Sequence, residues 1–202
     1  MRLIWICLAA ILLGGQAIAA EPGQKAEAAV DKAEVLEQKA AAEEGVTPRA
    51  KAITKSEAQA VDPAGKAPLD DAITCLARSI YWEAKGGASA DMEAVASVAM
   101  NRLGDEGFPD TLCEVVKQGS EQGDCQFSWW CDGRADQVKE DARYVIAKEI
   151  ARKALNQQLK DRTNGALYFH DRTVAPDWAR KYRKTAETGE FLFYKPRGGT
   201  AR

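Results

Sequence analysis

Apolar residues recur at helical spacing after the acidic pair Asp70-Asp71, either of which can cap a helix N-terminus. The apolar positions of this first run are Ile73, Leu76, Ala77, Ile80 and Ala84. Spacings of three and four residues place them on one face of a helix, and Gly86-Gly87 ends that helix. The same periodicity predicts a second helix from Ser89 to Leu103.

Shorter signals complete the pattern toward the C-terminus. Thr111-x-x-Glu114 is a capping box that predicts a short helix, and the apolar spacing over 136–159 predicts a long one. Asn164-Gly165 is typical of a turn. Strands are predicted over 166–170 and 191–194, with a short helix from Asp177 between them. We therefore expect an α+β domain that is predominantly helical, with a small β-sheet.

Residues 21–68 follow a different pattern. Ala, Glu, Lys and Gln dominate, no aromatic residue occurs, and large apolar side chains are few. We expect such a segment to bury too little surface to offset its ordering entropy, although it can form a transient helix over 26–44. It is interpreted as a spacer, partly helical or disordered, before one folded domain at 69–196 and a tail at 197–202. An interaction coil is the alternative.

The first twenty residues have the pattern of a signal peptide. Arg2 precedes an apolar run over 3–13, and Ala17-Ile18-Ala19 has the small-x-small form that signal peptidase recognises. The run is shorter than the roughly 20 apolar residues that span a bilayer, so a retained membrane anchor is the less favoured alternative. We expect an exported protein, in the periplasm or outside the cell at the wall, without stable membrane insertion once the signal is removed.

Cysteine usage fits export. Removal of the signal takes away Cys7 and leaves an even set: Cys75, Cys113, Cys125 and Cys131. An oxidising compartment then favours two disulfides, with three possible connectivities. We favour Cys125–Cys131 as a local clasp and Cys75–Cys113 as a longer link. A zinc site is the alternative, but the chain has no C-x-x-C pair and its one histidine is distant in sequence.

Charge argues against one class of partner. The chain has 28 Lys and Arg against 30 Asp and Glu, for a net charge of -2, and the two signs are finely mixed. No basic stripe of the kind that binds nucleic acid occurs, and no nucleotide-binding loop is present. We expect no metal or other cofactor, and a monomer.

Glu83 is the most informative single residue. It continues the apolar stripe of the first predicted helix, near its C-terminus, where desolvation and the negative end of the helix dipole both favour the protonated carboxyl. An acid that keeps its proton near neutral pH is what a departing glycosidic oxygen requires. Tyr81 and Trp82 beside it can offer rings for a sugar to stack on. The alternative is an ordinary surface glutamate at a helix end.

Two further segments carry candidate binding groups. The segment 125–133 lies between two cysteines and mixes rings with hydrogen-bonding side chains, as carbohydrate sites do. Its candidates are Gln126, Phe127, Ser128 and Asp132. In the strand predicted over 166–170, Tyr168 and His170 share one face. Core packing for the rings and a structural hydrogen bond for the histidine are the alternatives.

Taken together, these residues resemble the SleB-type cell wall hydrolases, which include the spore-cortex-lytic enzymes and many exported homologues of Gram-negative bacteria. The similarity covers essentially the whole folded domain and none of the spacer. Its segments are 75–87, 94–102, 108–116, 125–133, 165–170, 174–178 and 193–194. Several ordered motifs at compatible spacing make this a specific match.

The resemblance implies a lysozyme-like fold, related to goose-type lysozymes and lytic transglycosylases. It also implies a catalytic glutamate in a Glu-Ala-Arg-Gly motif, which corresponds to Glu83. The chain departs from the family pattern in three places. Lys85 replaces the usual arginine, Gly87 stands where an acidic residue is common, and Thr188-Gly-Glu-Phe191 lacks the histidine often found before the final aromatic pair.

We therefore expect cleavage of peptidoglycan glycan strands, at the β-1,4 bond between N-acetylmuramic acid and N-acetylglucosamine, with Glu83 as the acid. No second carboxylate of an ordinary glycosidase pair stands out, which favours lytic transglycosylation. Hydrolysis is the runner-up, with Asp132 as the residue that would position water. Gln126, Ser128, Tyr168 and His170 are expected to position substrate. A non-catalytic wall-binding module is the rival from another class.

Overall fold

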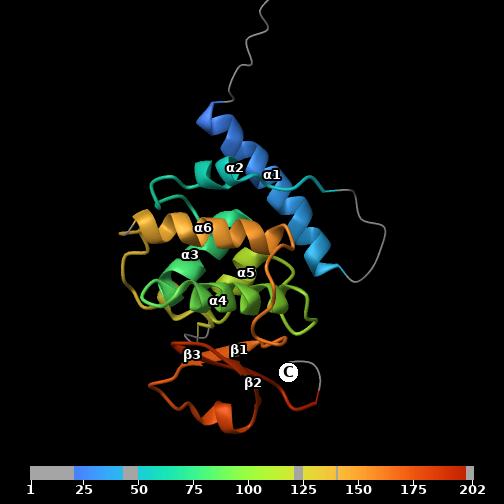
Figure 1. Cartoon of the computed structure of the whole chain (residues 1–202), viewed down its shortest axis with the longest axis vertical. Helices are drawn as coiled ribbons and strands as arrows, with labels where there is room; N and C mark the ends of the chain where they lie inside the picture. Colours follow the sequence, from blue (N-terminus) through green and yellow to red (C-terminus); the bar gives the residue numbers. More distant parts are fainter. Residues whose placement is uncertain (1–20, 43–49, 121–124, 140, 199–202) are drawn as a thin grey trace, which may run out of the picture.

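The computed structural model of the chain describes residues 21–42, 50–120, 125–139 and 141–198, so the predicted signal peptide lies outside the described residues. Helices occupy one end of the molecule and a three-stranded sheet the other (Figure 1). The elements are α1 (Pro22–Ala41), α2 (Lys55–Ala60), α3 (Ala72–Ala84), α4 (Ser89–Leu103), α5 (Leu112–Lys117), η2 (Ser128–Trp130), α6 (Asp141–Leu155), β1 (Tyr168–Asp171), η3 (Asp177–Arg180), β2 (Arg183–Glu187) and β3 (Phe191–Lys195). This arrangement confirms the predicted fold class.

Helix α3 lies at the centre and packs against α1, α4, α5 and α6. Its N-terminus is capped by Asp71, whose Oδ1 accepts a hydrogen bond from the Thr74 N–H at 2.9 Å, as the sequence predicts. Ile73, Leu76 and Ile80 are fully buried, and each such side chain stabilises the fold by about 1.5–3 kcal/mol. The rigid centre of the molecule is therefore the helix that carries Glu83.

Helices α4 and α5 occupy the predicted positions, whereas α6 is shorter than predicted. It starts at Asp141 and ends at Leu155, not at 136 and 159. Its expected first turn is irregular because the Asp136 carbonyl accepts hydrogen bonds from Arg78 and the Trp82 indole. After Leu155 the chain turns away with Gln157 at φ 57°. Tertiary contacts override the helical pattern at both ends.

The sheet has the order β1-β3-β2 and is antiparallel throughout, with Tyr168 opposite Tyr194 in the β1–β3 pair. The predicted turn at Asn164-Gly165 is present, and both residues have positive φ. Strand β2 was not predicted because its residues Arg-Lys-Thr-Ala-Glu lack an apolar alternation. It is a largely exposed edge strand held by its pairing with β3.

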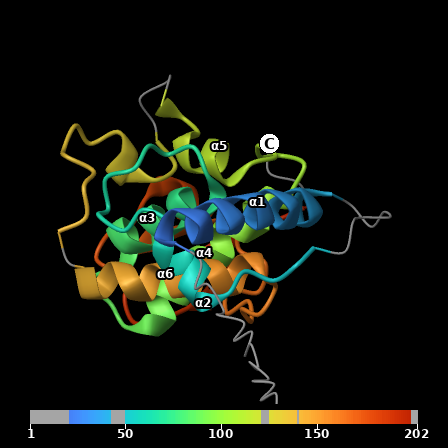
Figure 2. The ribbon, with the colours of Figure 1, turned by 90° about the horizontal axis from the view of Figure 1, so that it is seen from above.

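Part of the segment predicted as a spacer is folded. Ala29, Ala33 and Leu36 of α1 are buried in the core, and Glu37 accepts a hydrogen bond from the Leu112 N–H at 2.5 Å. Figures 1 and 2 show α1 lying across the other helices, with α2 beside it. Large apolar side chains are few in this segment, but its small alanines allow a close approach of two helices. The divisions of the chain at residues 20, 68 and 196 stay predictions.

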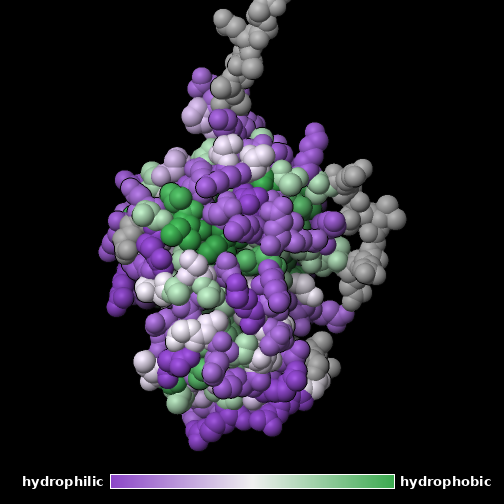
Figure 3. Space-filling model, viewed as in Figure 1, coloured by the Kyte–Doolittle hydropathy of each residue, from purple (hydrophilic) through white to green (hydrophobic). Residues whose placement is uncertain are grey.

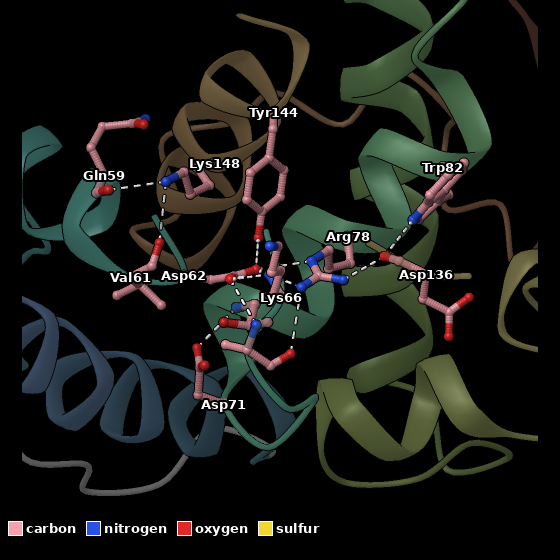
Figure 4. A network of polar contacts seen from close by, with 12 residues as sticks. Gln59, Val61, Asp62, Lys66, Asp71, Arg78, Trp82, Asp136, Tyr144 and Lys148 are labelled. Carbon is pink, nitrogen blue, oxygen red and sulfur yellow. Dashed lines mark hydrogen bonds and ion pairs between the residues drawn. The ribbon is translucent and has the colours of Figure 1, made fainter. Parts of the chain in front are cut away.

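A buried polar network fixes this N-terminal segment to the centre of the molecule (Figure 4). The Asp62 carboxylate pairs with Arg78 of α3 and accepts a hydrogen bond from the Tyr144 hydroxyl of α6 at 2.7 Å. It also accepts from the Lys66 and Ala67 N–H groups. The network therefore joins the chain before α3 to α3 and α6 at once.

Gly65 extends this attachment to the loop after η2. Its φ is +62°, and a Cβ there would lie 2.4 Å from the Val138 Cβ. The Gly65 carbonyl accepts a hydrogen bond from the Val138 N–H at 3.0 Å. Only glycine allows this contact, which holds residues 136–139 against α3.

Two disulfides join Cys75 to Cys113 and Cys125 to Cys131, the pairing favoured from the sequence. The first links α3 to α5, with the two Cα atoms 5.2 Å apart. The second encloses η2. One connects core helices, whereas the other holds a surface loop.

The described part of the chain contains no helix long and apolar enough to cross a membrane. The sheet end of the face in Figure 3 is mostly hydrophilic, and apolar residues show through over the helices.

Candidate functional site

A groove of about 700 Å³ lies between the C-terminal end of α3, the loop around η2 and the sheet. Its lining residues come from three places in the sequence. They are Trp82, Glu83 and Lys85 from α3 and its end, Gln126, Ser128, Trp129, Asp132, Arg134, Ala135, Asp136 and Lys139 from the loop, and Phe169, His170, Asp171 and Phe191 from the sheet. Most residues predicted from the sequence to act on a sugar thus meet in one place.

Glu83 lies half-buried in this groove, one residue before α3 ends. Its Oε1 atom is buried and has no hydrogen-bond partner in the described structure. Burial raises the pKa of Glu83 to about 7, while the charge of Arg102 and the N–H groups of Ser128 and Trp129 act in the opposite direction. The carboxyl is therefore balanced between its protonated and ionised forms near neutral pH.

The N–H groups that face Glu83 belong to η2, inside the loop closed by Cys125–Cys131. Trp129 anchors this loop, because only 5% of its surface is exposed. Backbone donors held in this way favour a carboxylate in front of them. The loop thus supplies a fixed partner for the ionised form of Glu83.

The α3 side of the groove combines a ring with a cation. The Trp82 indole donates to the Asp136 carbonyl at 3.1 Å, which fixes the ring against the loop. The Lys85 Nζ lies 4.5 Å from the centroid of the Trp82 ring. Lys85, which replaces the usual arginine, therefore still brings a positive charge to the groove.

His170 and Asp132, both predicted to position substrate or water, line the groove. The His170 ring stacks on Tyr194 with centroids 5.2 Å apart, and its Nε2 lies 3.1 Å from the Tyr194 hydroxyl. Its Nδ1 lies 2.8 Å from the Asp171 carbonyl. Because both ring nitrogens have protein partners, His170 forms part of the wall. Asp132 accepts from the Arg134 N–H at 2.8 Å.

Two predicted binding residues do not reach the groove. Tyr81 is fully buried, and its hydroxyl accepts a hydrogen bond from the Lys139 N–H at 3.1 Å. Phe127 is also fully buried in the core. Sequence neighbours of Glu83 and Ser128 point in different directions on a helix or tight turn, so Tyr81 and Phe127 support the site from behind. Their assignment as substrate-binding residues is wrong in this structure.

Tyr168 lies in a second pocket, of about 510 Å³, with Arg102, Trp178 and Tyr182. Gln126 and Phe169 line both this pocket and the groove, so the two adjoin. The sequence analysis missed three of these residues. Arg102 lies on the buried face of α4, Trp178 lies in η3 and Tyr182 follows it, so only the tertiary structure brings them together.

Two of the three departures from the family pattern meet at one carboxylate. A Cβ on Gly87 would lie 2.8 Å from Asp91 Oδ2. Asp91 Oδ1 accepts hydrogen bonds from the Thr188 hydroxyl and, at 3.0 Å, from the Glu190 N–H. Asp91 therefore ties the start of α4 to the turn between β2 and β3, in space that a larger residue at position 87 would occupy.

A larger cavity, of about 900 Å³, opens elsewhere along the sheet, beside Asn101, Arg183, Lys195 and Arg197. None of the predicted site residues lines it. Within the described ranges, no three His, Cys, Asp or Glu side chains gather as a metal site. The chemistry suggested by the sequence is therefore concentrated in the groove around Glu83.

Comparison with known proteins places this geometry in a family. A model of the cell wall hydrolase family matches residues 86–194, a match that begins three residues after Glu83. A spore cortex-lytic enzyme of Halalkalibacterium halodurans is 29% identical over 134 residues, which are 65% of this chain and 36% of that protein. One of Bacillus cereus is 27% identical over 126 residues, 61% of this chain and 44% of that protein. The chain thus spans less than half the length of these relatives.

Among solved structures, the catalytic domain of the germination-specific lytic transglycosylase SleB from Bacillus anthracis is similar. It is 25% identical, with a TM-score of 0.50, and the match covers 65% of this chain and 98% of that one. The resemblance to SleB-type enzymes inferred from the motifs is confirmed. Because the family model spans more than half of its residues, this chain belongs to the cell wall hydrolase family.

Proposed function

We propose that this chain is an exported lytic transglycosylase that cuts peptidoglycan strands between N-acetylmuramic acid and N-acetylglucosamine, in the periplasm or at the wall. The observation that carries the proposal is Glu83, whose partly desolvated carboxyl lies in the groove with a pKa of about 7. A carboxyl in this state can give up a proton and take one back at the same pH. Lytic transglycosylation requires both steps.

In the first step, protonated Glu83 donates to the glycosidic oxygen as the bond from that oxygen to C1 of the muramic acid breaks. The proton leaves with the N-acetylglucosamine hydroxyl. Glu83 is then a carboxylate, which the Ser128 and Trp129 N–H groups and the Arg102 charge stabilise. These groups are already in place before the reaction, so they need no reorganisation as charge develops.

In the second step, the 6-hydroxyl of the same muramic acid attacks C1, and its proton passes to the Glu83 carboxylate. A 1,6-anhydro end forms, and Glu83 returns to its starting form. No water enters the products. The buried Oε1 atom, which has no partner within the described residues, supports this step because a free oxygen is available to accept the proton.

Hydrolysis is the second candidate, and Asp132 favours it because this carboxylate lines the same groove as Glu83. Asp132 would orient a water toward C1 from across the groove. The reaction product separates the two chemistries, since a hydrolysed muramic end carries one more water than an anhydro end.

The test is digestion of purified sacculi by the mature protein, followed by mass spectrometry of the released muropeptides. We expect anhydro ends from the wild type and a loss of about 10²–10⁴-fold in rate for Glu83→Gln. Glu106→Gln, at an exposed glutamate outside the groove, is the matched control and should retain the wild-type rate.

Other outcomes would count against the proposal. Reducing ends from the wild type would establish hydrolysis, and Asp132→Asn should then lose activity as well. Binding to sacculi without release by either protein would identify a wall-binding module. Equal release by wild type and Glu83→Gln would exclude Glu83 as the acid.

A further inference from the structure

Arg102 is a buried cation with incomplete hydrogen bonding. Only 2% of its surface is exposed, its Nε donates to the Leu167 carbonyl at 2.7 Å, and its Nη1 is buried without a hydrogen-bond partner in the described structure. A buried guanidinium normally has its donors satisfied, because leaving one unpaired costs about 1–3 kcal/mol or more. The orphaned donor therefore calls for a partner that the described residues do not supply.

Aromatic rings surround the guanidinium. The Arg102 Cζ lies 5.2 Å from the centroids of Phe108 and Phe127 and 5.6 Å from that of Tyr168. Ring faces attract a cation but accept no strong hydrogen bond. The rings thus hold the charge in position without satisfying Nη1, and Arg102 lines the second pocket.

The residues whose negative charge would act on Arg102 are Tyr168, whose hydroxyl is neutral, and Glu83. When Glu83 is protonated, as its role as an acid requires, this compensation is lost. The described residues that line the pocket in front of Arg102 offer no carboxylate in its place. Its lining residues are Arg102, Cys125, Gln126, Tyr168, Phe169, Trp178 and Tyr182. Burial raises the pKa of Tyr168 to about 12, so this hydroxyl stays neutral.

We propose that this pocket is a subsite that binds a carboxylate of the glycan strand to Arg102, next to the bond that Glu83 cleaves. The proposal rests on the function proposed above and adds a specificity to it. Gln126 and Phe169 connect the pocket to the groove, so one strand can occupy both. Trp178 and Tyr182 form an aromatic wall, with ring centroids 5.6 Å apart, along which a sugar ring can stack.

A carboxylate is favoured over a neutral carbonyl for an electrostatic reason. A charged acceptor would compensate the Arg102 charge and satisfy its orphaned Nη1 together, and charge-assisted hydrogen bonds are roughly twice as strong as neutral ones. Wall strands carry carboxylates of two kinds: the lactyl group of muramic acid where the peptide has been removed, and the acids of the peptide stem.

The test is calorimetric binding to the full chain carrying Glu83→Gln, which cannot transfer the proton. The first probe is a peptide-free wall tetrasaccharide with free lactyl carboxylates, and the second is its methyl ester. We expect the acid to bind at least about tenfold more tightly than the ester, as charged hydrogen bonds allow. Adding Arg102→Gln should bring this ratio close to one while the ester still binds.

Lys85→Gln is the matched control, because it removes a cation of the connected groove and leaves Arg102 in place. The proposal is overturned if the acid-to-ester ratio survives Arg102→Gln, if it disappears with Lys85→Gln instead, or if the parent protein shows no preference. Should Arg102→Gln fail to fold, Tyr182→Glu keeps Arg102 and places a carboxylate in the pocket. That variant must lose the preference as well.

A third probe, the same tetrasaccharide with its peptide stems, identifies the source of the carboxylate. If the peptide-bearing probe binds more tightly than the methyl ester and this difference depends on Arg102, the carboxylate belongs to the peptide stem. If there is no such difference, the carboxylate belongs to the lactyl group. Both results uphold the subsite. Because binding is measured without cleavage, the carboxylate preference can still be interpreted if the protein proves not to cleave the strand. Conversely, sacculus cleavage without any carboxylate preference would remove only the subsite.

Discussion

The Asp62 carboxylate lies 2.8 Å from the Arg78 guanidinium, and 2–3% of the two side chains is exposed. Arg78 also donates to the Asp136 carbonyl, in the loop that lines the groove. A residue from the predicted spacer thus connects, through Arg78 of α3, to the loop that forms one wall of the groove. Together with the Gly65–Val138 contact, this ion pair ties the N-terminal segment to the site.

Replacing Asp62 should destabilise the protein strongly. Asp62→Asn leaves Arg78 buried without its counter-charge, which costs about 3–5 kcal/mol. Urea unfolding followed by circular dichroism measures this difference. Asp70→Asn, at an exposed acid eight residues further along the chain, should change the free energy of unfolding by less than about 0.5 kcal/mol. Similar losses in both variants would contradict the role of the pair.

Unfolding at low pH tests the same ion pair through the protonation of Asp62. Burial alone would raise the pKa of Asp62, but hydrogen bonds from Ala67, Tyr144 and Arg78 hold it below its ordinary value. The folded protein therefore binds this proton less readily than the unfolded chain. Its stabilising contribution is complete at neutral pH and is lost as the pH falls below about 4. Asp62→Asn should show a flatter loss of stability over that range.

The activity should fall on the alkaline side near pH 7. Glu83 must be protonated to act as the acid, and burial raises its pKa to about 7. We expect kcat/KM on soluble glycan strands to drop about tenfold per pH unit above this value. The Arg102 charge favours the Glu83 carboxylate, so removing this charge should raise the pKa of Glu83 and shift the alkaline decrease of kcat/KM to higher pH. A limb near pH 4.3, the ordinary glutamate value, would contradict a desolvated Glu83.

The two disulfides should have separable effects. By chain entropy, replacing Cys75 and Cys113 with serine should cost about 4 kcal/mol of stability, and replacing Cys125 and Cys131 about 2 kcal/mol. The second pair encloses the N–H groups that face Glu83, so its loss should lower kcat in protein that is still folded. Thermal melting and single-substrate kinetics on both double variants measure the two effects. If the two double variants lost the same activity when the same fraction of each was folded, the two disulfides would not have separate roles.

Helix α1 should prove part of the folded unit. Ala33 is 1% exposed against the core, so Ala33→Arg forces a large charged side chain into a closed contact. We expect a loss of more than about 3 kcal/mol. Asp31→Arg, on the exposed face of the same helix, is the control. If both variants melt like the wild type, α1 is only a spacer, as its composition suggests.

Local rules were sufficient where the sequence pattern and the tertiary structure agree. The Asp71 cap and the apolar stripe of α3 were predicted because the periodicity that forms the helix also buries it. Glu83 was singled out because its place on that stripe predicts a desolvated carboxyl and because the family resemblance implies a catalytic glutamate there, and burial raises its pKa to about 7. Strand β2 was missed because an exposed edge strand has little pattern of its own.

The residues that line the second pocket could not be predicted from the sequence. Arg102 belongs to the buried face of α4, where a charged residue gives no sign of which rings will cover it. Tyr81 and Phe127 were misplaced for a related reason. Adjacency to Glu83 or Ser128 fixes a position along the backbone, whereas the direction of the side chain depends on the packed neighbours.

The Asp62 network joins residues that are far apart in the sequence, and this affects when the site can form as the chain folds. Asp62 bonds Tyr144, 82 residues further on, and the sheet wall of the groove comes later still. A chain emerging N-terminus first therefore presents α3 well before the surfaces that desolvate Glu83 exist. On the function proposed above, an active groove requires β3, the last strand, to have packed against it, so a chain that has not finished folding would carry Glu83 without its complete site.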